Sequence, residues 1–210
     1  MKKANLIIIV IATLFVINAT NSFSQDWPQW RGIARDSKVT GFKAPSTWPA
    51  ELKQEWKVQV GFGDATPILV GNKIYLNTRQ GNDEAILCLD AGTGKELWKN
   101  QYPSTAVTGP AGSHPGPRST PAVADGKVVT FGASAILSCL DAITGKAIWR
   151  KENPTNAVQQ FFTGMSPWIV DNLCIAHVGT KANGEVVALD LKPGNEKWKW
   201  AGRSKGEPPE

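Results

Sequence analysis

The chain has 210 residues, of which 41% are hydrophobic and 20% are charged, and its formal net charge is +5. If Lys2 and Lys3 are removed with a leader, 21 of the 23 basic residues remain against 18 acidic ones, a net charge of +3. Because the basic residues are scattered and not run together, the composition does not indicate a protein that binds nucleic acid or an anionic membrane.

Residues 1–24 have the pattern of a secretory signal peptide. Two lysines precede an apolar run from Leu6 to Ile17, and the small residues Ser22 and Ser24 stand before Gln25. The run is shorter than the about 20 apolar residues that a membrane-spanning helix needs, and an uncleaved anchor is the alternative. We therefore expect an exported mature protein, periplasmic or secreted, that does not span a membrane.

Residues 25–50 predict an extended, mostly irregular lead-in. The segment opens with Asp-Trp-Pro-Gln-Trp-Arg-Gly from position 26 and contains two further prolines. Because Trp27 and Trp30 carry large apolar rings in a polar segment, we expect them to clamp the lead-in against the folded body. A role in stacking on a ligand is the alternative interpretation.

One motif then occurs three times at a spacing of about 50 residues, which is the signature of stacked repeats. Each copy has an apolar run that ends in Asp, a turn that contains Gly, and a Trp eight residues after the Asp. The Asp can accept backbone N–H bonds in a turn where Gly takes a positive φ, so we expect a hairpin at each motif. The third copy is looser, with Pro193 for Thr and Asn195 for Lys. The motif residues are Asp90, Gly94 and Trp98, then Asp141, Gly145 and Trp149, then Asp190, Gly194 and Trp198.

Two more strands are expected before each motif. The dipeptides Gly71-Asn72, Asp125-Gly126 and Asp171-Asn172 separate pairs of apolar, β-branched runs and favour tight hairpins. The paired runs are 66–70 with 73–78, 120–124 with 127–132, and 166–170 with 173–178. Each repeat therefore predicts a four-stranded antiparallel sheet, and a unit of this length that cannot bury both faces alone is typical of a β-propeller blade.

These residues resemble the PQQ-type β-propeller repeats of the quinoprotein alcohol dehydrogenase-like superfamily, whose motif reads Ala-x-Asp-x-x-Thr-Gly-Lys-x-x-Trp. The resemblance covers about residues 26–200. It implies an all-β fold in which each Trp docks between neighbouring blades. We expect the nine motif residues to serve this docking, so that the tryptophans carry stability and not chemistry.

The run around Trp56 is similar to the Trp strand of one more repeat. Propellers often close when an N-terminal strand completes the last blade, and closed rings typically have four to eight blades. We interpret residues 51–210 as an incomplete propeller of three complete blades plus a closing strand, an N-terminal fragment of a ring of seven or eight blades. The complete ring is expected to be monomeric, and the isolated fragment to associate through its uncovered sheet faces.

The three cysteines are expected to be packing residues. Cys88 and Cys139 occupy the same place in successive repeats, where the third copy has Ala188. Equivalent places in neighbouring blades should be too far apart for a disulfide, so each thiol is interpreted as a small buried group under a Trp. Cys174 falls on a strand of the third repeat and is expected in the core.

Function is expected in the connections between blades, because long loops on one rigid face form binding surfaces. The connection 101–118 is rich in Gly and Pro and carries His114 and Arg118 near the next inner strand. The structural interpretation is that both side chains bond backbone carbonyls in the central channel. The functional one is that they face a ligand, with the Arg118 guanidinium holding an anion. The connection 153–164 is a second candidate.

Catalytic patterns are few. His114 and His177 are too far apart in the sequence to form a spaced metal-binding pair, and His177 is interpreted as a packed strand residue. The sequence contains neither a Gly-x-Ser-x-Gly elbow nor a phosphate loop.

Two functions from different classes remain. The favoured one is a non-catalytic exported scaffold that binds a protein, peptide or glycan partner on a propeller face and needs no cofactor. The alternative, which the resemblance implies, is a dehydrogenase that oxidises an alcohol or sugar with PQQ and calcium. Such dehydrogenases typically have an adjacent Cys-Cys pair over the quinone and a Glu, Asn and Asp set for calcium. The sequence has no adjacent cysteines and no matching calcium set in these repeats.

The leader gives a direct prediction. Signal cleavage after Ser24 should produce a mature protein that begins at or near Gln25, which N-terminal sequencing of the protein from an expressing host will show. A mature chain that still carries Leu6 to Ile17 would rule this out.

Overall fold

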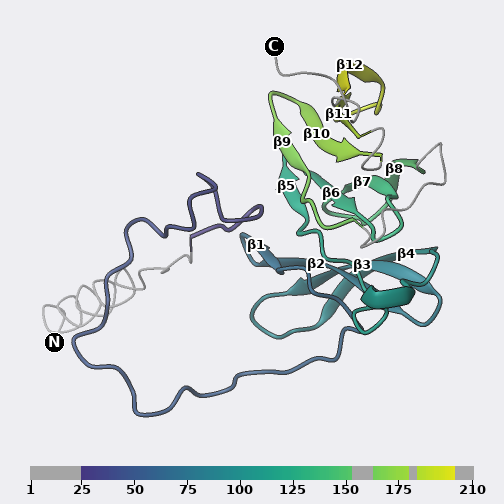
Figure 1. The fold of residues 1–210 in the computed structure, drawn as a ribbon. Coiled ribbons are helices and arrows are strands. Elements are labelled where there is room, and N and C mark those ends of the chain that lie inside the picture. Colours follow the sequence, from purple (N-terminus) through teal and green to yellow (C-terminus); the bar gives the residue numbers. More distant parts are fainter. Residues whose placement is uncertain (1–24, 153–162, 180–183, 202–210) are drawn as a thin grey trace, which may run out of the picture.

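The computed structural model describes residues 25–152, 163–179 and 184–201. The expected signal peptide and most of the 153–164 connection, including Gln159 to Phe162, lie outside the described residues. The described chain forms three four-stranded antiparallel sheets and one short 3₁₀ turn, η1 (Gly109–Ala111) (Figure 1). This arrangement confirms the all-β, partial β-propeller fold.

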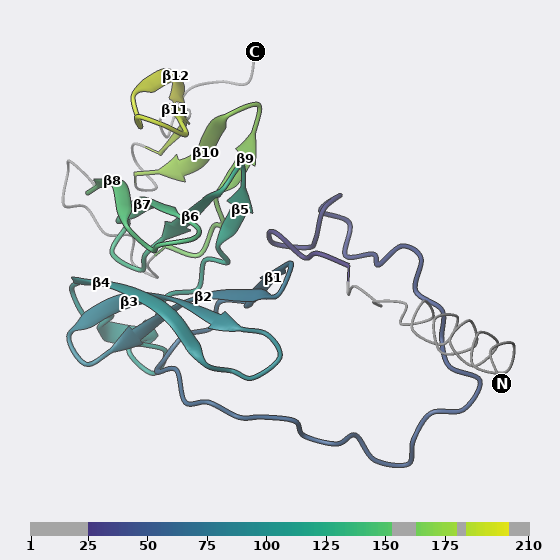
Figure 2. The ribbon, with the colours of Figure 1, turned by 180° about the vertical axis from the view of Figure 1, so that it is seen from behind.

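Each sheet follows the chain order of its strands, as expected for a blade. Blade 1 comprises β1 (Ile68–Val70), β2 (Lys73–Gln80), β3 (Asp83–Asp90) and β4 (Glu96–Pro103). Blade 2 comprises β5 (Ala122–Ala124), β6 (Lys127–Phe131), β7 (Leu137–Asp141) and β8 (Ala147–Lys151). Blade 3 comprises β9 (Trp168–Val170), β10 (Leu173–Val178), β11 (Glu185–Asp190) and β12 (Glu196–Ala201). The first strands β1, β5 and β9 lie on the side of the lead-in (Figure 1), and β4 and β8 lie on the opposite side (Figure 2).

The first hairpin of each blade has a two-residue turn with left-handed backbone. Asp125 and Gly126 have φ of 50° and 68°, and Asp171 and Asn172 have φ of 48° and 60°. These are type I′ values, whose twist matches that of the flanking strands. In blade 1 the left-handed residue is Gly71, at φ 57°. The three dipeptides therefore make the tight hairpins that the sequence predicts.

The first strands begin two residues later than expected. Pro67, Pro121 and Pro167 each precede the first strand residue of their blade. A proline has no backbone N–H to donate to the neighbouring strand, so regular pairing starts after it. The residues before each proline form a separate feature that matters for the site below.

The core lies between the blades. One cluster joins Ile68, Ile86 and Cys88 of blade 1 to Val128 and Leu140 of blade 2. A second joins Phe131 and Cys139 of blade 2 to Cys174, Val187 and Leu191 of blade 3. All three cysteines are free and buried, as the repeat spacing predicts. Because both faces of β3 and β7 are covered, these strands read as continuous apolar runs.

A bulge at the same place in every blade precedes the Trp. Cross-strand partners at this place are Cys88 and Trp98, Cys139 and Trp149, and Ala188 and Trp198, and the register shifts directly after each pair. A bulge adds a residue to one strand and turns the following side chain. In every blade a small side chain, Cys or Ala, therefore lies directly opposite the Trp.

Each Trp of blades 1 and 2 lies on the motif turn of the next blade. The Trp98 indole N–H donates to the Ala142 carbonyl at 3.2 Å, and a methyl group on Gly145 would lie 2.5 Å from Cε3 of that ring. Trp149 donates to the Leu191 carbonyl at 3.0 Å and covers Gly194 in the same way. Trp198 is 44% exposed.

Trp56 has the contact of a docking Trp without the expected strand. Its indole N–H donates to the Ala91 carbonyl at 3.0 Å, and its ring covers Gly94 of blade 1. Residues 51–60 nevertheless form no strand, because the described chain places no backbone partner beside them. The only backbone pairing nearby among the described residues is the bridge between Phe62 and Arg79. Among the described residues the segment expected to close the ring is therefore unpaired and is anchored by its indole.

The Asp of the motif closes the turn beneath each indole. Asp90 Oδ1 accepts the Thr93 N–H at 2.9 Å and the Thr93 hydroxyl at 2.7 Å. Asp141 makes the same two bonds with Thr144, at 2.8 and 2.9 Å. The Thr93 hydroxyl at Asp90 and the Thr144 N–H at Asp141 lower the pKa of these carboxyls. The bonds are therefore present above the ordinary carboxyl pKa and are lost as the pH falls through the lowered one.

The third motif turn lacks the Thr, but it keeps the fold of the other two. The Asp190 N–H donates to the Asn195 carbonyl at 2.8 Å, and the Lys197 ammonium lies 3.4 Å from Asp190 Oδ2. The third turn therefore keeps this closing backbone bond, while Gly194 has a φ of 91° against 71° and 70° for Gly94 and Gly145.

A buried polar network crosses from blade 1 to blade 2. Glu84 is fully buried and accepts the Tyr102 hydroxyl at 2.7 Å and the Ala133 N–H at 2.9 Å. The Arg150 guanidinium lies 4.1 Å from the centre of the Tyr102 ring and donates to Asn100 Oδ1 at 2.7 Å. Burial and the adjacent carboxylate raise the pKa of Tyr102 well above its usual value. The network satisfies a carboxylate that would otherwise be costly to bury.

The role of the docking tryptophans in stability is tested by two matched glycines. Gly145 and Gly126 both have left-handed backbone, with φ of 70° and 68°, but nothing lies within 4 Å of a methyl group placed on Gly126. Gly126→Ala should cost about 1–2 kcal/mol of unfolding free energy from the backbone alone. Gly145→Ala should cost about 1–3 kcal/mol more, because it displaces Trp98. Denaturant unfolding of the full-length variants measures both, and equal costs would refute the docking role.

Candidate functional site

Three equivalent tetrads stand directly before the first strands. They are Asp64-Ala65-Thr66-Pro67, Arg118-Ser119-Thr120-Pro121 and Gly164-Met165-Ser166-Pro167. The second and third tetrads are tied together, because the Ser119 hydroxyl donates to the Met165 carbonyl at 2.5 Å and the Thr120 N–H donates to Ser166 Oγ at 3.0 Å. Equivalent residues of neighbouring blades thus meet at one end of the inner strands.

The lead-in runs along the inner edge of the blades. Trp27 pairs with Leu69 of β1 through two backbone hydrogen bonds of 2.7 and 3.1 Å, and the Val123 N–H of β5 donates to the Pro28 carbonyl at 2.8 Å. The Asp26 carboxylate accepts the Gly71 N–H at 2.8 Å. The segment is therefore anchored to two blades, and the chain after it swings away from the sheets before it returns to blade 1 at Trp56 (Figure 1).

A cavity of about 370 Å³ opens where the lead-in meets the tetrads. Two lead-in residues line it, together with alternate residues of the first two tetrads, as the two-residue period of extended chain predicts, and three successive residues of the third. The lining residues are Trp30, Arg35, Asp64, Thr66, Arg118, Thr120, Gly164, Met165 and Ser166. The cavity is within the range of about 300–1,000 Å³ typical of small-molecule sites, and we take it as the candidate site.

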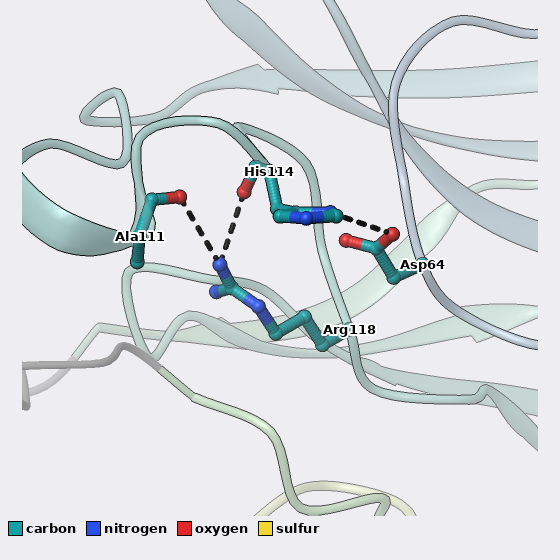
Figure 3. A network of polar contacts seen from close by, with 4 residues as sticks. All are labelled: Asp64, Ala111, His114 and Arg118. Atoms are coloured by element: carbon teal, nitrogen blue, oxygen red, sulfur yellow. Dashed lines mark hydrogen bonds and ion pairs between the residues drawn. The ribbon is translucent and has the colours of Figure 1, made fainter.

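Arg118 and His114 lie together beside this cavity (Figure 3). One nitrogen of Arg118, Nη2, donates to the His114 carbonyl at 3.0 Å and to the Ala111 carbonyl at 3.4 Å. The His114 imidazole Nδ1 lies 3.1 Å from Asp64 Oδ1, with side-chain exposures of 62% and 44% for the pair. Arg118 thus bonds backbone carbonyls and also lines the cavity, whereas His114 is connected to it only through its contact with Asp64.

Arg35 enters the cavity from the lead-in. Its guanidinium carbon lies 5.8 Å from the centre of the Trp30 ring and 5.2 Å from the centre of the Trp168 ring. Cation–π contacts of this length hold a guanidinium by its faces. Trp168 belongs to blade 3, so Arg35 links the lead-in to the blade that its backbone bonds do not reach.

The loop that carries Arg35 has unusual backbone. Arg31, Arg35 and Ser37 have φ of 66°, 57° and 64°, in the left-handed region that side-chain-bearing residues seldom adopt. The Arg31 carbonyl accepts the Ser37 N–H at 3.0 Å and the Gly32 carbonyl accepts the Arg35 N–H at 3.2 Å, so the loop is held closed. Such strain is concentrated at ligand clamps and other functional places.

Of the two candidate ligand-face residues, Arg118 lines this cavity, whereas His114 contacts the lining residue Asp64 without lining the cavity itself. Asp64, Thr66 and Arg35 were missed, although the alignment of the three tetrads before each proline was visible in the sequence. The interpretation of His177 as a packed residue was wrong, because it lies on an exposed position of β10.

The described residues hold no group of three or more His, Cys, Asp or Glu side chains arranged to bind a metal ion. They also include no helix of the length and apolarity that crossing a membrane requires.

A family model described as outer membrane protein assembly factor BamB matches residues 35–206. The chain belongs to this family of PQQ-like repeat propellers. An outer membrane protein assembly factor BamB from Xanthomonas campestris is 36% identical over 109 residues, which are 50% of this chain and 24% of that protein. Subunit 1 of the methanol dehydrogenase of Methylorubrum extorquens is 26% identical over 165 residues, 71% of this chain and 25% of that protein.

The family likeness extends to solved structures. The quinohemoprotein alcohol dehydrogenase of Comamonas testosteroni superposes with a TM-score of 0.59 at 21% identity, over 89% of this chain and 28% of that chain. At this identity the likeness concerns the propeller fold alone. The chain spans about a quarter of the length of the curated relatives it matches, 24% and 25% for the two named above. The curated proteins that this chain resembles include both an assembly factor and a dehydrogenase subunit.

The contacts of Arg118 and His114 give a prediction about how firmly the loop 109–117 is held. Arg118→Ala removes the donor that holds the Ala111 and His114 carbonyls. The free energy of local opening in residues 109–117, measured by amide hydrogen exchange, should therefore fall by about 1.5–3 kcal/mol. His114→Ala is the matched change, since it removes only an exposed pair worth less than about 1 kcal/mol. Hydrogen exchange on the full-length protein compares them. Equal protection in both variants would contradict this account of Arg118.

Proposed function

We propose that this protein is an exported β-propeller scaffold that binds a protein partner through its lead-in and the adjoining propeller face. The observation that carries the proposal is the exposure of large apolar side chains along residues 30–62. Eight side chains in this stretch are exposed: Trp30, Ile33, Val39, Phe42, Trp48, Leu52, Val58 and Phe62. Exposed apolar groups gathered in one segment are typical of protein interaction surfaces.

The aromatic pair at the far end of the lead-in forms the centre of this surface. Phe42 and Trp48 stack with ring centres 6.4 Å apart and are 63% and 61% exposed. Large aromatic side chains are enriched among the residues that dominate binding energy in protein interfaces. Because both rings are more than half exposed, a partner protein can contact them directly.

The family assignment supports the same class of function. The matching family model and the Xanthomonas relative are described as outer membrane protein assembly factors. We therefore propose that the partner is a protein of an outer membrane assembly pathway and that the scaffold acts in the exported compartment that its leader predicts. A catalytic role is not required for this function.

A quinone-dependent dehydrogenase is the second candidate, and the cavity favours it in one respect. PQQ is an acidic quinone with three carboxyl groups, and Arg35, Arg118 and the tetrad hydroxyls are donors that suit such groups. Asp64 is the acidic residue that lines the cavity, and Cys88, Cys139 and Cys174 are separate in the sequence. The residues thus fit the acid groups of the quinone, while the adjacent cysteines typical of the dehydrogenases are not in this sequence.

The scaffold role is tested in the source organism by gene replacement. A Phe42→Ser, Trp48→Ser double variant should lower the amount of β-barrel proteins in the outer membrane, as deletion of the gene should. Ile143→Ser is the matched control, because Ile143 is 75% exposed on a turn of blade 2, away from the lead-in. A photo-crosslinking residue at position 48 should capture one defined partner, whose affinity should fall by about 2 kcal/mol or more on losing the aromatic pair.

The dehydrogenase gives the opposite result. Unchanged outer membrane proteins after deletion, together with stoichiometric PQQ binding and dye-linked oxidation of an alcohol by the purified full-length protein with calcium, would replace the scaffold by the enzyme.

A further inference from the structure

The cavity between the lead-in and the tetrads has a chemistry of its own. Two guanidinium groups line it, from Arg35 and Arg118, against one carboxylate, Asp64. The Asp64 carboxylate has a partner in the His114 imidazole at 3.1 Å. The balance of charge around the cavity therefore favours an anionic ligand, and Arg side chains favour carboxylates through paired N–H bonds.

Both guanidiniums are held in place before a ligand arrives. Two backbone carbonyls fix Arg118 through Nη2. The rings of Trp30 and Trp168 contact Arg35 from separate elements. Stacking on a ring occupies the face of a guanidinium, whereas its N–H groups lie in its plane and point past the ring. Arg35 can therefore donate to a carboxylate while it stays stacked, and little side-chain freedom is lost on binding.

Hydroxyl groups form the rest of the polar lining. Thr66, Thr120 and Ser166 occupy the same position in the three tetrads and all line the cavity. Ser166 Oγ accepts the Thr120 N–H, which leaves the Ser166 O–H to donate elsewhere. A hydroxyl both donates and accepts, so a row of them suits a ligand that carries hydroxyls itself.

We propose that this cavity binds a small hydroxy acid, such as a sugar acid, with its carboxylate on Arg35 and Arg118 and its hydroxyls along the tetrads and Asp64. The strained backbone at Arg31, Arg35 and Ser37 supports this assignment, because it presents Arg35 to the cavity from a closed loop. The inference goes beyond the scaffold role and does not depend on it, since a partner protein would engage the exposed aromatic pair of the lead-in.

Three matched ligands test the chemistry by calorimetric titration of the full-length protein without added quinone. D-gluconate carries a carboxylate and hydroxyls, D-sorbitol carries the hydroxyls without the carboxylate, and hexanoate carries the carboxylate without the hydroxyls. We expect saturable binding of gluconate. The affinity of sorbitol should be lower by about tenfold or more because it lacks the charge-assisted hydrogen bonds, and that of hexanoate by about tenfold or more because it lacks several neutral ones.

Two cations of the lead-in, one that lines the cavity and one that does not, provide the matched variants. Arg35→Gln should weaken gluconate binding about ten- to hundredfold, the effect of losing a hydrogen bond to a charged group. Lys38→Gln should leave it unchanged, because Lys38 is exposed on the same lead-in and does not line the cavity. Thermal unfolding of both variants confirms that each is folded.

Several outcomes would overturn the proposal. They are no saturable binding of gluconate, equal binding of gluconate and sorbitol, equal effects of the Arg35→Gln and Lys38→Gln variants, or stoichiometric PQQ binding that excludes gluconate. Failure here leaves the outer membrane phenotype of the aromatic pair untouched, so the two proposals fail separately.

Discussion

The contact between a tryptophan and the motif turn of the next repeat is the interaction on which this structure depends. The residue after the motif Asp serves two blades at once. In blade 2 the Ala142 N–H is bonded to the Gly126 carbonyl of its own sheet, while its carbonyl accepts the indole N–H of Trp98 from blade 1. One peptide group thus couples the internal hairpins of a sheet to the stacking of the sheets. The left-handed Gly that follows leaves room for the ring, and a side chain there would remove that room.

The fold could be predicted from the sequence because its signals are local and repeated. The dipeptides at 125 and 171, the spacing from Asp to Trp and the placement of small residues opposite each Trp recur in every copy, and each constrains the backbone within a few residues. The strand expected around Trp56 is unpaired among the described residues for the complementary reason. Its indole contact is encoded locally, whereas a strand also needs a backbone partner, and no local pattern supplies one. The short β1, β5 and β9 show the same principle, since the prolines that delay them were visible in the sequence but were not used.

The candidate site was less predictable because most of its contacts join segments without a shared period. Arg118 was found from its place before an inner strand. Arg35 reaches the same cavity because the lead-in is bonded to β1 and β5, and two complete blades separate Arg35 from Trp168 in the sequence. The buried Glu84 was likewise hidden in an apolar run, where the partners that satisfy it, Tyr102 and the Ala133 N–H, come from other strands. Long-range pairings of single residues leave no trace in spacing or composition.

Blade stacking and ligand contact fall to different residues in each repeat. The turns under each indole keep the blades stacked, and positions 64, 118 and 164 take no part in that stacking. These positions hold an acid, a base and a glycine on the same backbone. A duplicated unit can therefore diversify its chemistry one copy at a time while its architecture stays constant. In such a chain the residues at a few equivalent positions determine the binding specificity. A new specificity therefore requires substitutions at those positions and not a new fold.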